Sequence, residues 1–276
     1  MRAVTTTATL ALLLLSASPC TGRPCELLAV TPGAAPSAAA VDELQRACVA
    51  LANAGCRRML LREPTLSASQ VEALVESLLP LYPPGGVVVH EKCANARAIA
   101  SAHGLGLHLR STSDWRSERA GWPGQLGVSA HSQEELRLAV DLGMQWAFFS
   151  PVARPTSKPG DDRPPIGEEA ILDAQERLPQ LDIYALGGIS PAMASRLAAG
   201  GARGIAVLGG LFPAGAATTT VQAEAAARRY LDALGEAASD TCSSDAGNAQ
   251  VEEGSVACSS RGTRGDDDLE GTGQRS

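Results

Sequence analysis

Eight brief, almost wholly apolar runs recur at even spacing along this chain, and they constrain its fold more than any other feature. Apolar runs without polar alternation are typical of strands buried on both faces, as in parallel sheets. The segments between them mostly repeat apolar residues every three or four positions, which predicts amphipathic helices. The expected strands are 26–30, 58–61, 86–89, 106–109, 126–128, 146–149, 183–186 and 204–208.

Helical spacing is clearest in four segments, namely 41–54, 71–79, 136–142 and 193–199. Eight strands alternating with helices predict a single (β/α)8 barrel, a TIM barrel, over residues 25–237. A doubly wound open sheet is the alternative, although it would not naturally use so many evenly spaced strands. Residues 111–124 show little helical pattern, so we expect a loop with a short turn of helix there.

The two ends of the chain differ in composition from the barrel. Residues 238–276 are rich in Ser, Gly, Asp and Glu and cannot bury much apolar surface, which predicts a disordered tail. Residues 1–24 form either an unstructured extension or a weak signal peptide, since Arg2 precedes a short apolar stretch. We therefore expect a cytoplasmic protein, or an exported one if that segment is a true signal. No apolar run approaches the roughly 20 residues that span a bilayer.

Charge and cysteine content narrow the possible partners. The formal net charge is −7 and no Lys/Arg stripe is present, which argues against nucleic acid as a partner. Seven cysteines are scattered without a CxxC pair, so neither a zinc site nor a disulfide framework is expected. A small molecule is the expected ligand, and assembly into a homo-oligomer is possible.

Glycine pairs follow the last two expected strands, at Gly187-Gly188 and at Gly209-Gly210. In a barrel, functional groups project from the carboxyl ends of the strands, and phosphate commonly binds after strands seven and eight. Glycine lets the backbone N–H groups approach an anion closely. The two pairs therefore favour a phosphate site, while tight turns without a ligand are the alternative.

Candidate catalytic groups stand at the ends of other strands. His131 could transfer a proton, because imidazole titrates near neutrality, and Ser129 lies two residues before it. The segment 154–163 contains Arg154, Lys158 and Arg163 and could clamp a phosphate or diphosphate. A solvated loop is the alternative for that segment.

Five segments together resemble the thiamine phosphate synthase/TenI family over roughly residues 25–212. The last three are specific in combination. They are LLREPTLS at 60–67, GLHLRSTSD at 106–114, GVSAHSQEEL at 127–136, SPVARPTSKPGDDRPPIG at 150–167 and YALGGISPAMASRLAAGGARGIAVLGGLF at 184–212.

The resemblance implies a (β/α)8 barrel that binds a phosphorylated thiazole. It assigns the phosphate to Gly187, Gly188, Leu208 and Gly209, with Thr156 and Lys158 as further binding residues on the loop. The family includes thiamine phosphate synthases, which join hydroxymethylpyrimidine diphosphate to thiazole phosphate with Mg²⁺. It also includes TenI-type proteins, which aromatise thiazole phosphate carboxylate by moving a proton.

The sequence departs from the synthase pattern at three strand ends. Pro64 stands where synthases usually carry Lys, His90-Glu91 replaces Asn-Asp, and Ser113 aligns with a metal-binding Asp. Mg²⁺ prefers oxygen ligands, so Glu91 and Asp114 are the metal candidates if the chain is a synthase.

These departures favour a TenI-like thiazole tautomerase that needs no cofactor. In this hypothesis His131 and Ser129 are catalytic and Arg62 orients the ligand, while Arg62 or Arg110 pairs with the substrate carboxylate. A divergent thiamine phosphate synthase with Mg²⁺ is the first alternative. A barrel that binds thiazole phosphate without catalysis is the second.

Overall fold

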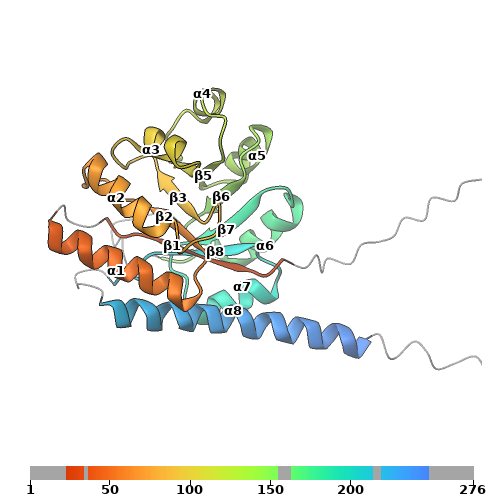
Figure 1. Ribbon diagram of the computed structural model, residues 1–276. Helices are drawn as coiled ribbons and strands as arrows, with labels where there is room; N and C mark the ends of the chain where they lie inside the picture. The colour runs from red at the N-terminus through yellow and green to blue at the C-terminus, as the bar shows by residue number, and fades with distance from the viewer. Residues whose placement is uncertain (1–22, 34–36, 155–162, 214–218, 249–276) are drawn as a thin grey trace, which may run out of the picture.

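The computed structural model describes residues 23–33, 37–154, 163–213 and 219–248, without the side chains of 238–248. Eight parallel strands form a closed barrel in which each strand pairs with the next in sequence, and β1 pairs with β8. Helices surround the barrel (Figure 1). The predicted TIM barrel is therefore confirmed and the open sheet is excluded. The strands are β1 Glu26–Val30, β2 Arg58–Leu61, β3 Val87–His90, β4 Gly106–Leu109, β5 Leu126–Ala130, β6 Trp146–Phe149, β7 Asp182–Leu186 and β8 Gly204–Val207.

One helix follows each strand. Helix α4 has six residues, in agreement with the short turn of helix expected after β4. Helix α8 continues past the expected domain boundary at residue 237, and residues 249–276 lie outside the described part of the chain. The helices are α1 Ala38–Ala54, α2 Ala68–Leu78, α3 Ala96–Ala102, α4 Trp115–Ala120, α5 Gln133–Asp141, α6 Gly167–Arg177, α7 Pro191–Ala199 and α8 Thr220–Asn248.

Serine caps fix where several helices begin, and this also fixes the loops above the strands. The Ser67 hydroxyl accepts from the backbone N–H of Gln70, whose side chain accepts in return from the Ser67 N–H. Ser132 caps α5 directly after β5, because its hydroxyl accepts from the Glu135 backbone N–H. His131 is thereby held at the boundary between a strand and a capped helix.

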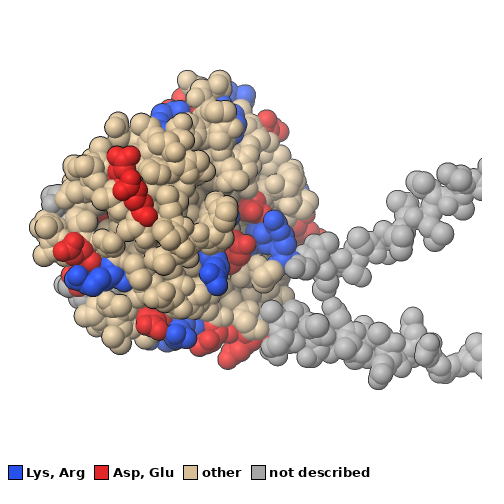
Figure 2. All heavy atoms as spheres, viewed as in Figure 1, with Lys and Arg blue, Asp and Glu red and all other residues tan. Residues whose placement is uncertain are grey.

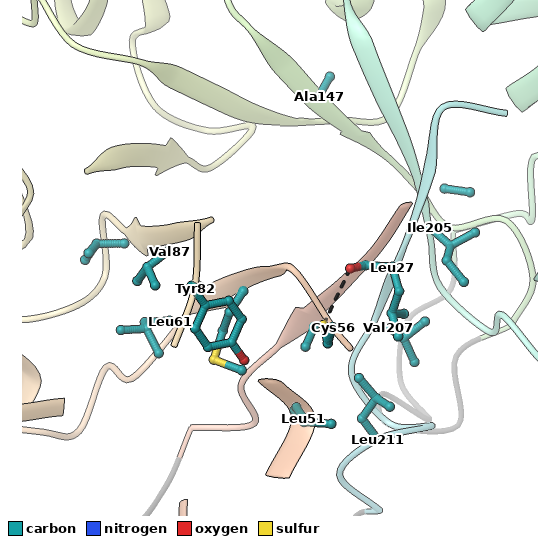
Figure 3. Close-up of a cluster of buried hydrophobic side chains, with 14 of the residues drawn as sticks. Leu27, Leu51, Cys56, Leu61, Tyr82, Val87, Ala147, Ile205, Val207 and Leu211 are labelled. Atoms are coloured by element: carbon teal, nitrogen blue, oxygen red, sulfur yellow. Dashed lines mark hydrogen bonds between the residues drawn. The ribbon is translucent and has the colours of Figure 1, made fainter. Parts of the chain in front are cut away.

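The apolar core has two parts, one on each face of the barrel wall. The larger lies between strands and helices and contains aliphatic side chains such as Leu27, Leu51 and Leu61 (Figure 3). The smaller fills the barrel interior and includes three aromatic rings, Trp146, Phe148 and Tyr184. Aromatic residues make up only 3% of the chain, so their concentration inside the barrel shapes the floor of the site above them.

The remaining expectations about the ends and the surface are met only in part. None of the described helices is long and apolar enough to cross a membrane. Cys25, Cys48, Cys56 and Cys93 are unpaired thiols. On the face seen in Figure 2, basic and acidic side chains are scattered beside one another and form no basic stripe. Residues 1–22 lie outside the described ranges, so the leader remains an expectation.

Candidate active site

A cavity of about 420 Å³ opens at the carboxyl ends of the strands. Its floor combines apolar side chains with buried polar ones and its rim carries four cationic side chains, while no Asp or Glu belongs to the described lining. The chain as a whole is acidic, so this concentration of positive charge points to an anionic ligand. The lining is Val30, Leu60, Arg62, His90, Lys92, His108, Arg110, Ser111, Thr112, Ser129, His131, Phe148, Ser150, Pro151, Arg163, Leu186, Gly187 and Leu208.

His131 lies at the cavity wall between β5 and β6. Its Nδ1 is 2.8 Å from the Ser150 carbonyl oxygen, which can only accept, and 2.8 Å from Nη1 of Arg163, which can only donate. The same Nη1 lies 2.6 Å from Nε2, so the guanidinium contacts both ring nitrogens. The Glu135 carboxylate accepts from the His131 backbone N–H at 2.5 Å and fixes the main chain here. The ring is thus held between the Ser150 carbonyl and the Arg163 guanidinium.

Ser129 and His108 form a second polar group on the cavity floor. The Ser129 hydroxyl lies 3.0 Å from His108 Nε2, and His108 Nδ1 accepts from the Trp146 indole N–H at 3.1 Å. The His108 side chain is fully buried, and burial holds the pKa of its imidazole well below the usual value. His108 is therefore neutral at physiological pH.

His90 is also buried and neutral. Burial, with a smaller contribution from the Arg62 charge, lowers the pKa of His90 to about 4. Its Nδ1 accepts from the Lys92 backbone N–H at 3.0 Å, and its ring lies 5.7 Å from that of His108. The two histidines add polar surface to the floor without adding charge.

The cations of the rim come from separate loops. Arg62 follows β2 and Lys92 follows β3, and neither has an ion-pair partner within the described ranges. Arg110 follows β4 and is paired with Glu91. Arg163 reaches the cavity from the far end of the segment after β6, and it contacts His131. Arg62 and Lys92 are therefore available to an anionic ligand.

The glycine pairs stand at the expected ends of β7 and β8, but they differ in exposure to the cavity. Gly187 and Leu208 line it, whereas Gly188 and Gly209 are adjacent and not part of its lining. Gly187 has φ +101°, and a Cβ there would lie 3.0 Å from Pro151. Gly210 is required by packing, because a Cβ there would lie 2.2 Å from the Tyr230 hydroxyl.

The two carboxylates suggested as metal ligands do not meet in this cavity. Both oxygens of Glu91 accept from the Ser113 hydroxyl, at 2.7 and 2.8 Å, and one is also bound by Arg110. Burial raises the pKa of Glu91, but the hydrogen bonds from Arg110 and Ser113 outweigh it and leave the pKa below its usual value. Asp114 caps α4 through the Ser117 N–H and lines a separate, smaller pocket.

The structure therefore brings together His131, Ser129, Arg62, Gly187 and Leu208. Thr156 and Lys158 lie outside the described residues, so their expected roles stay predictions. Lys92 and Ser150 stand at the ends of expected strands, but sequence reasoning gave them no role, and it missed the contact between Arg163 and His131. The contact between Arg163 and His131 spans 32 residues and had no sequence signal.

Several known proteins are similar to this chain. The model of the thiamine monophosphate synthase family matches residues 27–211. The thiamine-phosphate synthase of Bordetella avium is 32% identical over 196 residues, which is 67% of this chain and 89% of that enzyme. That of Lysinibacillus sphaericus is 41% identical over 86 residues, covering 31% of this chain and only 40% of that enzyme.

A solved structure has the same fold. Thiamine phosphate pyrophosphorylase from Pyrococcus furiosus superposes with a TM-score of 0.61 at 17% identity, over 77% of this chain and 96% of that one. The fold and site define a (β/α)8 barrel whose mouth is built for an anionic ligand. Within that class, the chain belongs to the thiamine monophosphate synthase family, a family of thiamine-biosynthesis enzymes.

Proposed function

We propose that this chain is a thiazole tautomerase that acts on thiazole phosphate carboxylate. One observation carries the proposal: His131 lines a cavity with four cations and no carboxylate in its described lining. Such a cavity suits a small ligand with anionic groups, and it contains a group that can move a proton. Tautomerisation requires nothing more, since it transfers one proton and changes no atom count.

The ligand lies across the cavity. Its phosphate approaches the backbone at Gly187 and Leu208, where β7 and β8 end. Its carboxylate pairs with Arg62 and Lys92 after β2 and β3. In a closed barrel of this order β3 is opposite β7, so the two anionic groups are held apart and the ring is centred over the cavity floor.

His131 then transfers the proton. A ligand anion draws the Arg163 guanidinium away from Nε2, and the freed lone pair takes a proton from a carbon of the non-aromatic tautomer. The double bonds shift, the ring becomes aromatic, and Nε2 returns the proton to a second carbon. The Ser150 carbonyl holds the Nδ1 proton throughout and stabilises the imidazolium formed in between.

The test is the rate of aromatisation of the purified chain with the non-aromatic tautomer. His131→Asn is expected to lower the rate about 10²-fold or more, as for the loss of a general acid/base, while affinity for the aromatic product is kept. His103→Asn is the matched control, because His103 lies at the end of α3 beside Glu72, outside the cavity lining, and should leave the rate unchanged. An unchanged rate in His131→Asn contradicts the proposal.

A divergent thiamine phosphate synthase is the second candidate, and the names of the relatives favour it. That reaction needs Mg²⁺, and the described residues do not fit the ion. Glu91 is engaged by Arg110 and Ser113, and Asp114 faces another pocket. The diagnostic assay is diphosphate release from hydroxymethylpyrimidine diphosphate and thiazole phosphate with Mg²⁺. Release that Lys158→Ala abolishes would favour the synthase.

A further inference from the structure

Inside the barrel, the side chains of three neighbouring strands are matched so that the Trp146 indole reaches His108. The indole lies across Gly106 of β4 and Gly127 of β5. A Cβ at Gly127 would lie 1.9 Å from Trp146 Nε1, and one at Gly106 would lie 2.7 Å from Cη2. Both positions must therefore lack a side chain for the indole to lie where its N–H meets His108 Nδ1.

This contact fixes the tautomer of His108. An indole N–H can only donate, so Nδ1 accepts and carries no proton. The ring is neutral, because burial holds its pKa far below the usual value and the nearby His90 adds to the effect. A neutral imidazole carries one proton, which must then be on Nε2. Nε2 consequently donates to the Ser129 hydroxyl oxygen 3.0 Å away.

A hydroxyl that accepts from a fixed donor has its own proton left to give. Within the described ranges, His108 is the only hydrogen-bond partner of the Ser129 hydroxyl. Ser129 lines the cavity, whose titratable rim is basic. We infer that Trp146 and His108 are positioning residues that direct the Ser129 hydroxyl proton into the cavity, where it donates to an anionic oxygen of the ligand.

The identity of that ligand rests on the proposed function, whereas the orientation of Ser129 does not. The Ser129 hydroxyl keeps its proton and a second lone pair, and the cationic rim makes an anionic acceptor its favoured partner.

The first measurement leaves Trp146, His108 and Ser129 unchanged. In the full chain labelled with ¹⁵N-histidine, long-range ¹H–¹⁵N spectra report the tautomer of each ring. The chain has four histidines, so His90→Asn, His103→Asn and His131→Asn identify the His108 signals by elimination. We expect His108 to be protonated on Nε2 alone from pH 8 down to pH 5. A proton on Nδ1, or an imidazolium near neutrality, would overturn the inference.

Trp146→Phe removes the indole N–H and should give His108 a mixture of both tautomers. Trp122→Phe is the matched control, because its N–H donates to the Gln125 carbonyl outside the barrel interior and the His108 tautomer should not change. If His108 kept a single tautomer in Trp146→Phe, Trp146 would have no positioning role.

Calorimetric titration with the aromatic thiazole phosphate carboxylate tests the consequence for binding. Ser129→Ala should weaken binding by about 3- to 10-fold, the usual range for one hydrogen bond. Trp146→Phe should weaken it less, and the double variant should be no weaker than Ser129→Ala alone. Additive losses would overturn the coupling. If the wild type shows the Nε2 tautomer and binds no ligand, the proposed function fails while the orientation of Ser129 stands.

Discussion

Replacing Gly127 by alanine tests how tightly the barrel interior is built around Trp146. The new Cβ would lie 1.9 Å from Nε1 and Cε2 of the ring and 2.5 Å from Cδ1. Carbon atoms pack at about 3.5–4.0 Å, so the ring must retreat by about 1.5–2 Å. Its retreat is opposed by Arg58, whose guanidinium lies over the ring at 5.4 Å, and by Gly106 on the next strand.

Two costs add in this variant. Overpacking of an interior of this kind costs about 1–3 kcal/mol. A displaced indole also leaves His108 Nδ1 buried without its donor, which costs about 1–3 kcal/mol more. The free energy of unfolding should therefore fall by about 4 kcal/mol, a large part of the about 5–15 kcal/mol typical of a domain.

Urea denaturation followed by circular dichroism measures this loss. Gly121→Ala is the matched control, because its φ is −91° and a Cβ there meets no atom closer than 3.6 Å, so the change should stay within about 0.5 kcal/mol. Trp146→Phe combined with Gly127→Ala should recover part of the loss, since the smaller ring lacks the clashing Nε1. Wild-type stability in Gly127→Ala would refute the reasoning.

Three further predictions concern the cavity. Gly187→Ala should weaken binding of inorganic phosphate by about tenfold or more in a titration, because alanine is strained at a φ of +101° and its Cβ would push the backbone away from Pro151. Unchanged affinity would show that phosphate does not bind at the end of β7. Arg62→Gln should weaken ligand binding and reduce its dependence on salt, with the melting temperature unchanged; equal salt dependence would contradict the ion pair. For His90 alone, stability should fall by about 3 kcal/mol between about pH 6.5 and 4, because its lowered pKa of about 4 means that the unfolded chain binds the proton first. His108 acts in the same direction. His90→Asn should therefore show a smaller slope of stability against pH than the wild type, and an equal slope in the two would contradict the assignment.

The fold was predictable because a parallel barrel buries both faces of each strand. That burial leaves apolar runs that need no knowledge of distant contacts, and the runs at 58–61, 106–109 and 146–149 coincide with β2, β4 and β6. Local chemistry fixes helix starts, as at Ser67 and Ser132, whose hydroxyls accept from backbone N–H groups of the first turn. The end of α8 was not predictable from the sequence. The polar composition after residue 238 favours disorder, yet polar residues can also continue an exposed helix, and α8 runs to Asn248.

The site was predictable only where position along a strand decides it. His131, Ser129 and Gly187 line the cavity because they stand at carboxyl ends of strands. The pairing of Glu91 with Arg110 depends on loops from two different strands, and no sequence spacing announces it. The role of His108 likewise depends on Trp146, 38 residues away, and on the absence of intervening side chains.

The most direct measurement gives one preparation of the full chain both sets of substrates. With the non-aromatic thiazole phosphate carboxylate and EDTA, we predict rapid formation of the aromatic tautomer. With hydroxymethylpyrimidine diphosphate, thiazole phosphate and Mg²⁺, we predict no release of diphosphate. Diphosphate release without any aromatisation would contradict the tautomerase assignment and make the chain a synthase, and thiazole phosphate binding without either reaction would make it a non-catalytic binder.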